Sequence, residues 1–210
     1  MTGTAPTGAV PAATAAADGA RVGRCDRVLA VVLAAGEGSR FRGDSHKLLA
    51  PLRGRPVVAW AYDHASSAGL DGVIVVAGAA DVRPFLPADA TVVDNPAWSC
   101  GQAGSLQVAR RYAEAHGYDA MVIGLGDQPF VPAATWRLIG RSREDLVAAV
   151  LEGQRSPPVR IARSLWALLP DHGDEGARVL MRSRPDLLIE IACPGKPVDI
   201  DTVEDLQTWS

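Results

Sequence analysis

A glycine-rich segment with two nearby cations has the residue types that a polyphosphate ligand requires. Residues 33–40 read Leu-Ala-Ala-Gly-Glu-Gly-Ser-Arg, and Lys47 follows shortly after them. Glycines such as Gly36 and Gly38 let backbone N–H groups approach a phosphate with no side chain in the way. Arg40 and Lys47 add the positive charge that a polyphosphate needs. The segment therefore predicts a triphosphate-binding loop.

Two other phosphate loops, and a plain solvated turn, are the alternatives for this segment. A dinucleotide-binding loop has a third glycine leading into a helix, whereas Phe41 stands at that position and residues 42–54 stay rich in Gly, Asp, Ser and Pro. The next apolar run ends at Gly78 without an acidic residue for a ribose. The sequence also lacks the P-loop pattern G-x-x-x-x-G-K-[ST]. The preceding apolar run and the two cations argue against a solvated turn.

Three aspartates could hold a hard cation. Asp127 follows the apolar run 120–123 in Gly124-Leu-Gly-Asp-Gln-Pro-Phe130, and its oxygens suit Mg²⁺. Asp199 and Asp201 lie near the C-terminus, where Asp201 or Thr202 could instead cap the last helix. Asp127 could likewise be a turn residue. We predict Asp127 as a metal ligand with Asp201 as the second, and the choice between Asp199 and Asp201 stays open.

The rest of the chain alternates between apolar runs and helical patterns that can position these groups. The runs predict strands at 28–35, 73–77, 91–93, 120–123, 146–151, 159–162 and 188–192. Apolar periodicity and caps predict helices at 56–68, 104–116, 132–141, 175–184 and 202–209. Such alternation predicts an α/β fold, a three-layer α/β/α sandwich with a mostly parallel sheet. Ligands of such sheets bind at the carboxyl ends of the strands, where both the loop and Asp127 would lie.

Composition narrows the classes of function. The 210 residues are 48% hydrophobic and 21% charged with a net charge of −3, which predicts a globular protein without nucleic acid as its main partner. Residues 1–24 are rich in Ala, Thr, Gly and Pro, and we expect a disordered low-complexity tail before a single domain at 25–210. The scattered cysteines and histidines argue against disulfides and zinc, and no apolar run reaches the roughly 18 residues of a membrane span. A cytoplasmic location is the expectation.

Two further features have simple interpretations. Cys100 has no His/Asn constellation to make it a nucleophile, so a small buried side chain is expected. The arginines in 137–143 are interpreted as a solvated helix face.

Four motifs in order resemble the nucleotidyltransferases of molybdenum-cofactor biosynthesis, within the NTP-transferase superfamily. The loop L-A-A-G-x-G-x-R matches residues 33–40, and residues 95–106 are similar to the stretch N-P-x-W-x-x-G … S-L. Residues 126–131 resemble the metal-binding segment G-D-x-P, and residues 199–206 the ending D-I-D-T-P-E-D-L. In this chain Ser156-Pro-Pro-Val159 stands where the family has G-H-P-V.

The resemblance implies a Rossmann-like nucleotidyltransferase fold of the glycosyltransferase-A type and transfer of CMP from CTP to molybdopterin, with release of pyrophosphate. Ala34 and Ala35 resemble the cytidylyltransferase branch rather than the guanylyltransferases. The implied catalytic residues are Arg40, Lys47 and Asp127, with Mg²⁺ on Asp127 and Asp201. The implied nucleotide-binding residues are Leu33, Ala34, Ala35, Gly36, Gly38, Arg40, Lys47, Gly78, Asn95 and Asp127. The segments 98–105 and 155–160 would face the acceptor.

Other functions stay open at this point. The same scaffold could use GTP, or a sugar-phosphate or lactate-phosphate acceptor. A non-catalytic accessory protein that delivers cofactor to a molybdenum hydroxylase, through transient contact, belongs to a different class. Pyrophosphate release separates the enzymes from the accessory role.

Overall fold

The computed structural model describes residues 26–43 and 45–210, so the predicted tail at 1–24 lies outside the described part of the chain. The larger strands are β1 (Val28–Ala34), β4 (Gly72–Ala77), β5 (Val92–Asp94), β6 (Ala120–Leu125), β7 (Leu146–Leu151), β8 (Gln154–Ala162) and β9 (Leu188–Cys193), and β2 (Pro51–Leu52) and β3 (Arg55–Pro56) form a hairpin. The helices are α1 (Val57–Ser66), α2 (Gln102–Ala115), α3 (Ala133–Gly140), α4 (Ala177–Ser183) and α5 (Val203–Trp209), with short 3₁₀ turns at Arg83–Phe85, Trp98–Cys100 and Arg163–Leu168. None of the helices in the described residues is long and apolar enough to cross a membrane.

Seven strands form one sheet in the order β5-β4-β1-β6-β8-β7-β9. Strand β1 pairs in parallel with β4 and β6, β4 with β5, and β7 with β9, whereas β8 runs antiparallel to both of its neighbours. This confirms the predicted mostly parallel sheet. The antiparallel β8 brings its first residues to the same edge as the carboxyl end of β6.

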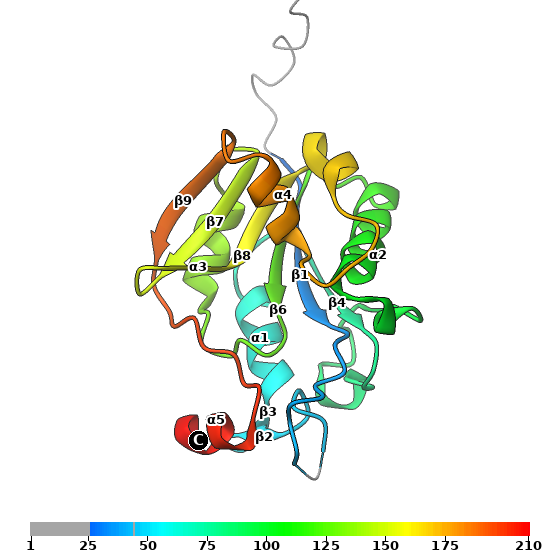
Figure 1. Ribbon diagram of the computed structural model, residues 1–210, viewed down its shortest axis with the longest axis vertical. Helices are drawn as coiled ribbons and strands as arrows, with labels where there is room; N and C mark the ends of the chain where they lie inside the picture. The colour runs from blue at the N-terminus through cyan, green and yellow to red at the C-terminus, as the bar shows by residue number, and fades with distance from the viewer. Residues whose placement is uncertain (1–25, 44) are drawn as a thin grey trace, which may run out of the picture.

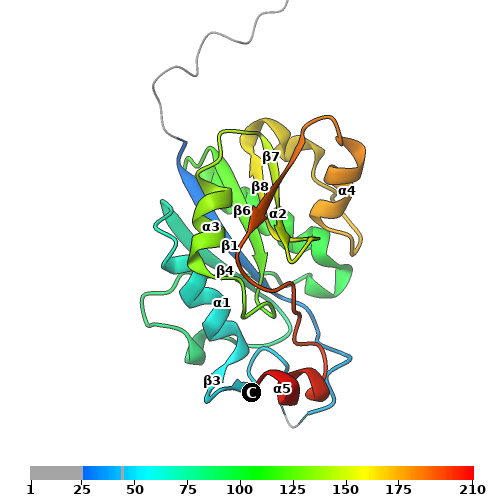
Figure 2. The same cartoon turned by 90° about the vertical axis from the view of Figure 1, so that its left-hand side faces the viewer.

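Helices cover both faces of the sheet, as Figure 2 shows with α1 and α3 on one side and α2 and α4 on the other (Figures 1 and 2). All seven residues of β1 are buried, because alternate side chains enter two separate cores. Val28, Ala30 and Val32 face α1 and α3, and Leu29 and Leu33 face α2 and α4. The predicted three-layer α/β/α sandwich is therefore confirmed.

Three elements begin two or more residues away from their predicted first residue. Helix α2 begins at Gln102, directly after Gly101 at a φ of 101°, and α4 begins at Ala177 instead of residue 175. Strand β8 begins at Gln154 instead of residue 159. The sequence pattern did not predict the start of this strand, because Pro157 and Pro158 lack the N–H that strand pairing requires. The structure places them where the β7–β8 register shifts, between the pairs Ala148↔Val159 and Ala149↔Ser156.

The arginines at 137–143 have a structural role that the sequence interpretation missed. Arg137 donates through Nε to the carbonyl of Ala68 at 2.9 Å and through Nη2 to that of Ser67 at 3.2 Å. Arg141 donates to the carbonyl of Gly69 at 2.5 Å. These carbonyls follow the end of α1, where cations are favourable because helix-terminal C=O groups lack intrahelical partners. Both residues are exposed, as the interpretation of a solvated face expects, and they also stabilise the end of α1.

The half-buried His64 on α1 predicts acid sensitivity. Burial lowers the pKa of His64, and this outweighs the opposing effects of Asp63 and of a hydrogen bond to the Pro129 backbone. As the pH falls, the unfolded chain therefore binds a proton at this position before the folded protein does, so folding stability falls below about pH 6.5. We expect His64→Gln to show a smaller decrease in Tm than the native chain between about pH 7.5 and about pH 5.5.

The exposed His172 supplies the matched control for this experiment. His172→Gln should leave the pH dependence of Tm unchanged. Equal decreases in Tm for His64→Gln and the native chain would contradict the assignment.

Candidate active site

The loops after β1 and β6 lie side by side because these strands are hydrogen-bonded neighbours. Leu33 pairs with Leu125, and the N–H of Gly126 donates to the carbonyl of Leu33 at 2.8 Å. A Cβ atom at Gly126 would approach the Cβ atom of Ala34 to 3.2 Å, so glycine suits this close approach. The glycine-rich loop and Asp127 thus meet at one edge of the sheet.

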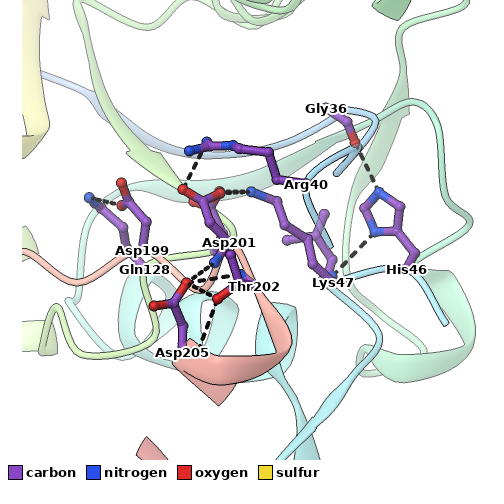
Figure 3. Close-up of polar contacts among 11 residues, drawn as sticks. Gly36, Arg40, His46, Lys47, Gln128, Asp199, Asp201, Thr202 and Asp205 are labelled. Carbon is purple, nitrogen blue, oxygen red and sulfur yellow. Dashed lines mark hydrogen bonds and ion pairs between the residues drawn. The ribbon is translucent and has the colours of Figure 1, made fainter. Parts of the chain in front are cut away.

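Two cations and two carboxylates from three distant segments form one cluster there. The Nζ atom of Lys47 lies 2.5 Å from Oδ2 of Asp127 and 2.7 Å from Oδ1 of Asp201. The Nη2 atom of Arg40 lies 2.8 Å from Oδ2 of Asp201. Figure 3 shows Arg40 and Lys47 each contacting Asp201. The structure thus brings together the residues predicted to be catalytic and metal-binding.

Lys47 is the buried centre of this cluster. The residue is only 9% exposed, and Arg40, with a side chain 74% exposed, lies at the rim. Burial disfavours the charged form of Lys47, but the two aspartates outweigh it, so its pKa lies above the ordinary value. Lys47 therefore carries a full positive charge where phosphate oxygens would arrive.

Asp127 has the free oxygen that a metal ligand needs. Its Oδ1 atom is buried and has no hydrogen-bond partner within the described residues. Both oxygens of Asp201, by contrast, are paired with Lys47 and Arg40. Across residues 26–43 and 45–210, no group of three His, Cys, Asp or Glu side chains could hold a metal ion. Asp127 could therefore supply one ligand to a divalent cation, whose other ligands would have to come from a substrate or from solvent.

Asp199 lies beside the cluster without joining it. Gln128 donates through Nε2 to Oδ1 of Asp199 at 2.7 Å (Figure 3). Partial desolvation, followed by the charge of Asp127, raises the pKa of the Asp199 carboxyl. The region is therefore rich in negative charge, which favours a cation.

The ring of His46 holds the glycine-rich loop in place, a contact that the sequence did not predict. Gly38 has a φ of 67°, and its carbonyl accepts from the N–H of Phe41 at 2.9 Å. The ring of His46 lies 3.0 Å from the carbonyl of Gly36 through Nε2, and its Nδ1 accepts from the N–H of Leu48 at 3.2 Å (Figure 3). This pair of contacts assigns the proton to Nε2. His46 thereby ties the loop to the segment that carries Lys47.

A cavity of about 510 Å³ lies over the glycine-rich loop. Seven of the predicted nucleotide-binding residues line it, namely Leu33, Ala34, Ala35, Gly36, Gly38, Lys47 and Asp127. Trp98, Ser99, Gly101, Gln102 and Ser105 also line this cavity, although the segment 98–105 was predicted to face the acceptor. Cys100 in the same segment is exposed, so the expectation of a buried side chain there is wrong. We name it the nucleotide cavity.

A second cavity of about 600 Å³ adjoins the first. Leu33, Gln102, Leu125, Asp127 and Asp174 line both of them. Arg40, Asp199 and Asp201 line only the second, which we name the acceptor cavity. Asp127 therefore lies at the junction of the two cavities.

Gly78 and Asn95 lie behind the wall of the nucleotide cavity and do not line it. A Cβ atom at Gly78 would come within 2.6 Å of both the Ala35 carbonyl oxygen and the Trp98 Cβ atom. Asn95, 3% exposed, donates to Oγ of Ser105 at 3.0 Å. These two residues shape the wall by packing.

The segment 155–160 divides between two environments. Arg155, Ser156, Pro157 and Val159 line the acceptor cavity. Arg160 is different, because it is 1% exposed and binds Asp26 and the carbonyls of Gly140 and Glu144. Side chains alternate along a strand, so Arg160 has a structural role instead.

Sequence reasoning missed Asp174, which lines both cavities. The loop of Asp174 packs on the start of α2, where the N–H of Ala103 donates to the carbonyl of Gly173 at 2.9 Å. A Cβ atom at Gly101 would come within 2.6 Å of Asp174 Oδ1. The glycine-rich stretch 173–176 was the only local signal for this contact.

Comparisons with known proteins identify the family. The family model of the MobA-like NTP transferase domain matches residues 30–187. Nicotine blue oxidoreductase of Paenarthrobacter nicotinovorans is 30% identical over 201 residues, which cover 85% of this chain and 94% of that protein. The bifunctional protein GlmU of Symbiobacterium thermophilum is 33% identical over 143 residues, but these cover 66% of this chain and only 30% of GlmU.

Solved structures show the same fold. Rv0371c from Mycobacterium tuberculosis superposes with a TM-score of 0.73 at 31% identity, covering 88% of this chain and 98% of that one. A structure of Rv0371c in complex with manganese gives a TM-score of 0.70 at 31% identity, covering 87% and 97%. A nucleotidyl transferase from Methanothermobacter gives a TM-score of 0.73 at 28% identity, covering 87% and 95%. The chain therefore belongs to the MobA-like family of NTP transferases, a family of nucleotidyltransferases.

Proposed function

We propose that this protein transfers CMP from CTP to a phosphorylated acceptor, molybdopterin, and releases pyrophosphate. The observation that carries the proposal is the position of Asp127 at the junction of the two cavities, with Lys47 lining the first and Arg40 the second. A bimolecular transfer needs both substrates to meet at one charged centre.

The reaction is an in-line displacement at the α-phosphorus of the nucleotide. An oxygen of the acceptor phosphate forms the new P–O bond, the bond to the β-phosphate oxygen breaks, and pyrophosphate leaves with that electron pair. Lys47 is already charged and buried, so it offsets the negative charge that develops on the phosphates without rearranging solvent. Arg40 lies at the rim on the acceptor side, where it would orient the attacking phosphate.

Mg²⁺ is the metal that we propose for this site, held by the free Oδ1 atom of Asp127 and by substrate phosphates. When bound, it supplies Lewis-acid polarisation of the phosphate oxygens. Asp201 could become the second ligand if it exchanged one of its two cation partners, Lys47 or Arg40. Arriving phosphates would favour that exchange, because they compete for both cations.

The choice of CTP depends on Ala34 and Ala35 at the wall of the nucleotide cavity. Their small side chains leave the backbone of the loop accessible, so a base could be recognised by backbone N–H and C=O groups. The same pair of residues resembles the cytidylyltransferase branch, whereas the guanylyltransferases have Ala-Gly-Gly there.

The deciding experiment measures pyrophosphate release with each of the four ribonucleoside triphosphates in the presence of Mg²⁺ and molybdopterin. We expect turnover with CTP at least about tenfold faster than with GTP. Turnover only with GTP, or only with a sugar phosphate or lactate phosphate as acceptor, would replace the substrate assignment. Tight binding of molybdopterin without pyrophosphate release under any condition would instead indicate the accessory role.

A second candidate function is reduction of a conjugated heterocycle in the acceptor cavity by a reduced nicotinamide nucleotide in the nucleotide cavity. It is favoured by the relative named nicotine blue oxidoreductase, which matches this chain over 94% of its own length. A hydride would pass from the nicotinamide to the heterocycle, with a proton from solvent completing the reduction. Oxidation of NADH or NADPH that depends on the heterocycle, with no pyrophosphate release from CTP, would select this function.

A further inference from the structure

A third cavity, of about 350 Å³, lies between the β2–β3 hairpin, α1, the loop that follows β6 and the chain just after β9. Figures 1 and 2 show this end of the molecule, with α5 beside the hairpin. No residue that lines this cavity also lines the nucleotide cavity or the acceptor cavity. We name it the hairpin cavity, and it is a separate space from the candidate active site.

The walls of the hairpin cavity are mostly apolar and are held in place by hydrogen bonds. The indole Nε1 of Trp60 donates to the carbonyl of Leu52 at 3.0 Å, so the polar atom of this ring is already satisfied. The N–H of Lys196 donates to the carbonyl of Phe130 at 3.2 Å and fixes the loop after β6. The apolar lining residues are Leu52, Trp60, Pro129, Phe130 and Pro132. A preformed cavity with such walls suits an aromatic ring.

Arg53 and Lys196 give the hairpin cavity a positive charge. The guanidinium carbon of Arg53 lies 5.6 Å from the centre of the Phe130 ring, and its Nε donates to the carbonyl of Trp209 at 3.0 Å. The Nζ atom of Lys196 lies 4.6 Å from the centre of the Trp209 ring. Among residues 26–43 and 45–210, no carboxylate forms an ion pair with either cation. The described lining of this cavity contains no acidic side chain, whereas five acidic side chains line the acceptor cavity. A ligand that complements this charge is an anion.

From this arrangement we infer that the hairpin cavity is a second ligand site, which binds a small aromatic anion with its ring against the apolar walls and its acidic group at Arg53 and Lys196. An aliphatic anion lacks the flat faces that pack on Trp60 and Phe130, and a neutral ring leaves both cations without a partner. A volume of about 350 Å³ suits one ring or two fused rings. The inference is independent of the proposed function, because the catalytic cluster does not line this cavity.

The test is isothermal titration calorimetry of the full chain with two probes that share one ring system, 2-naphthoate and the neutral 2-naphthamide. We expect the naphthoate to bind about tenfold more tightly, as charge-assisted contacts predict. Arg53→Gln and Lys196→Gln should each reduce this preference about threefold, and the double variant should abolish it. Both side chains are exposed, so neither substitution opens the core. Arg163→Gln is the matched control, because Arg163 also stacks on a ring, that of Trp166 at 5.7 Å, but does not line the hairpin cavity. It should keep the full preference.

Several outcomes would overturn the inference. Equal affinities of the native chain for the two probes, or a preference that survives in the double variant, would remove the role of the two cations. Cyclohexanecarboxylate that binds as tightly as 2-naphthoate would remove the role of the aromatic ring. Displacement of 2-naphthoate by CTP would place the probe in the nucleotide cavity, and an affinity that falls as the protein concentration rises would assign the hairpin cavity to a second copy of the chain. Since these titrations require no turnover, their result is separate from that of the pyrophosphate-release experiment.

Discussion

Replacing Asp127 by asparagine should lower the rate of pyrophosphate release about 1000-fold while the protein stays folded. Asparagine keeps the shape of the side chain but removes the negative charge beside Lys47 and weakens binding of a cation at Oδ1. Lys47 would retain Asp201 as its partner, so no buried charge is left alone. Initial rates at saturating Mg²⁺, and Tm by differential scanning calorimetry, measure the two effects.

Asp63→Asn is the control for this substitution, because Asp63 is a carboxylate on α1 that pairs with Arg55 at the surface. It should keep the native rate. Titration with Mn²⁺ followed by electron paramagnetic resonance should show weaker metal binding in Asp127→Asn only. A rate within about threefold of the native value in Asp127→Asn would contradict its assignment as the metal ligand.

Lys47→Met is the second substitution with a large expected effect, because it removes both a catalytic charge and a structural one. We expect pyrophosphate release to fall by a factor of about 100 or more, since a preorganised cation near the phosphates is lost. The free energy of unfolding at neutral pH should fall by about 3 kcal/mol, the usual order when one partner of a buried ion pair is removed.

The stability that Lys47→Met loses depends on pH. In the native protein the pKa of Lys47 is raised by Asp127 and Asp201, so its stabilising contribution is present at neutral pH and is lost only as the pH rises through that pKa. Lys47→Met removes this contribution, so the stability difference between the native protein and the variant should shrink as the pH rises above about 10.5, where the native protein also loses it. Chemical denaturation of both proteins across a pH series measures this change.

A divalent cation should compensate for the missing ammonium group. In the native protein the Lys47 ammonium already bridges Asp127 and Asp201, so Mg²⁺ must compete with it, whereas in Lys47→Met it does not. We expect Mg²⁺ to raise Tm more in the variant than in the native chain. The other lysine, Lys196, supplies the control, because Lys196→Met removes a cation that stacks on Trp209 away from the site. Equal responses to Mg²⁺ in all three proteins would contradict the bridging role of Lys47.

Much of the fold follows from local pattern. Continuous apolar runs that end in glycine predicted β1, β4 and β6, because a strand covered by helices on both faces needs apolar side chains on both faces. The same pattern did not predict the first half of β8. Pro157 and Pro158 lack the N–H groups that pair neighbouring strands, so their presence argues against a strand. Nor could it show that β8 runs antiparallel.

Part of the candidate site could likewise be predicted from the sequence, and part of it only the tertiary structure shows. Glycines next to cations after a buried run, and an aspartate at the end of another, were recognisable because backbone conformation and charge are properties of short segments. The pairing of Lys47 with Asp201, 154 positions apart, was not, because only tertiary packing brings such segments together. The same holds for His46 at the Gly36 carbonyl and for Asp174 between the cavities. Residue type decided which groups could carry charge in this protein, and the packing of distant segments decided which charges are neutralised and which remain available to a ligand.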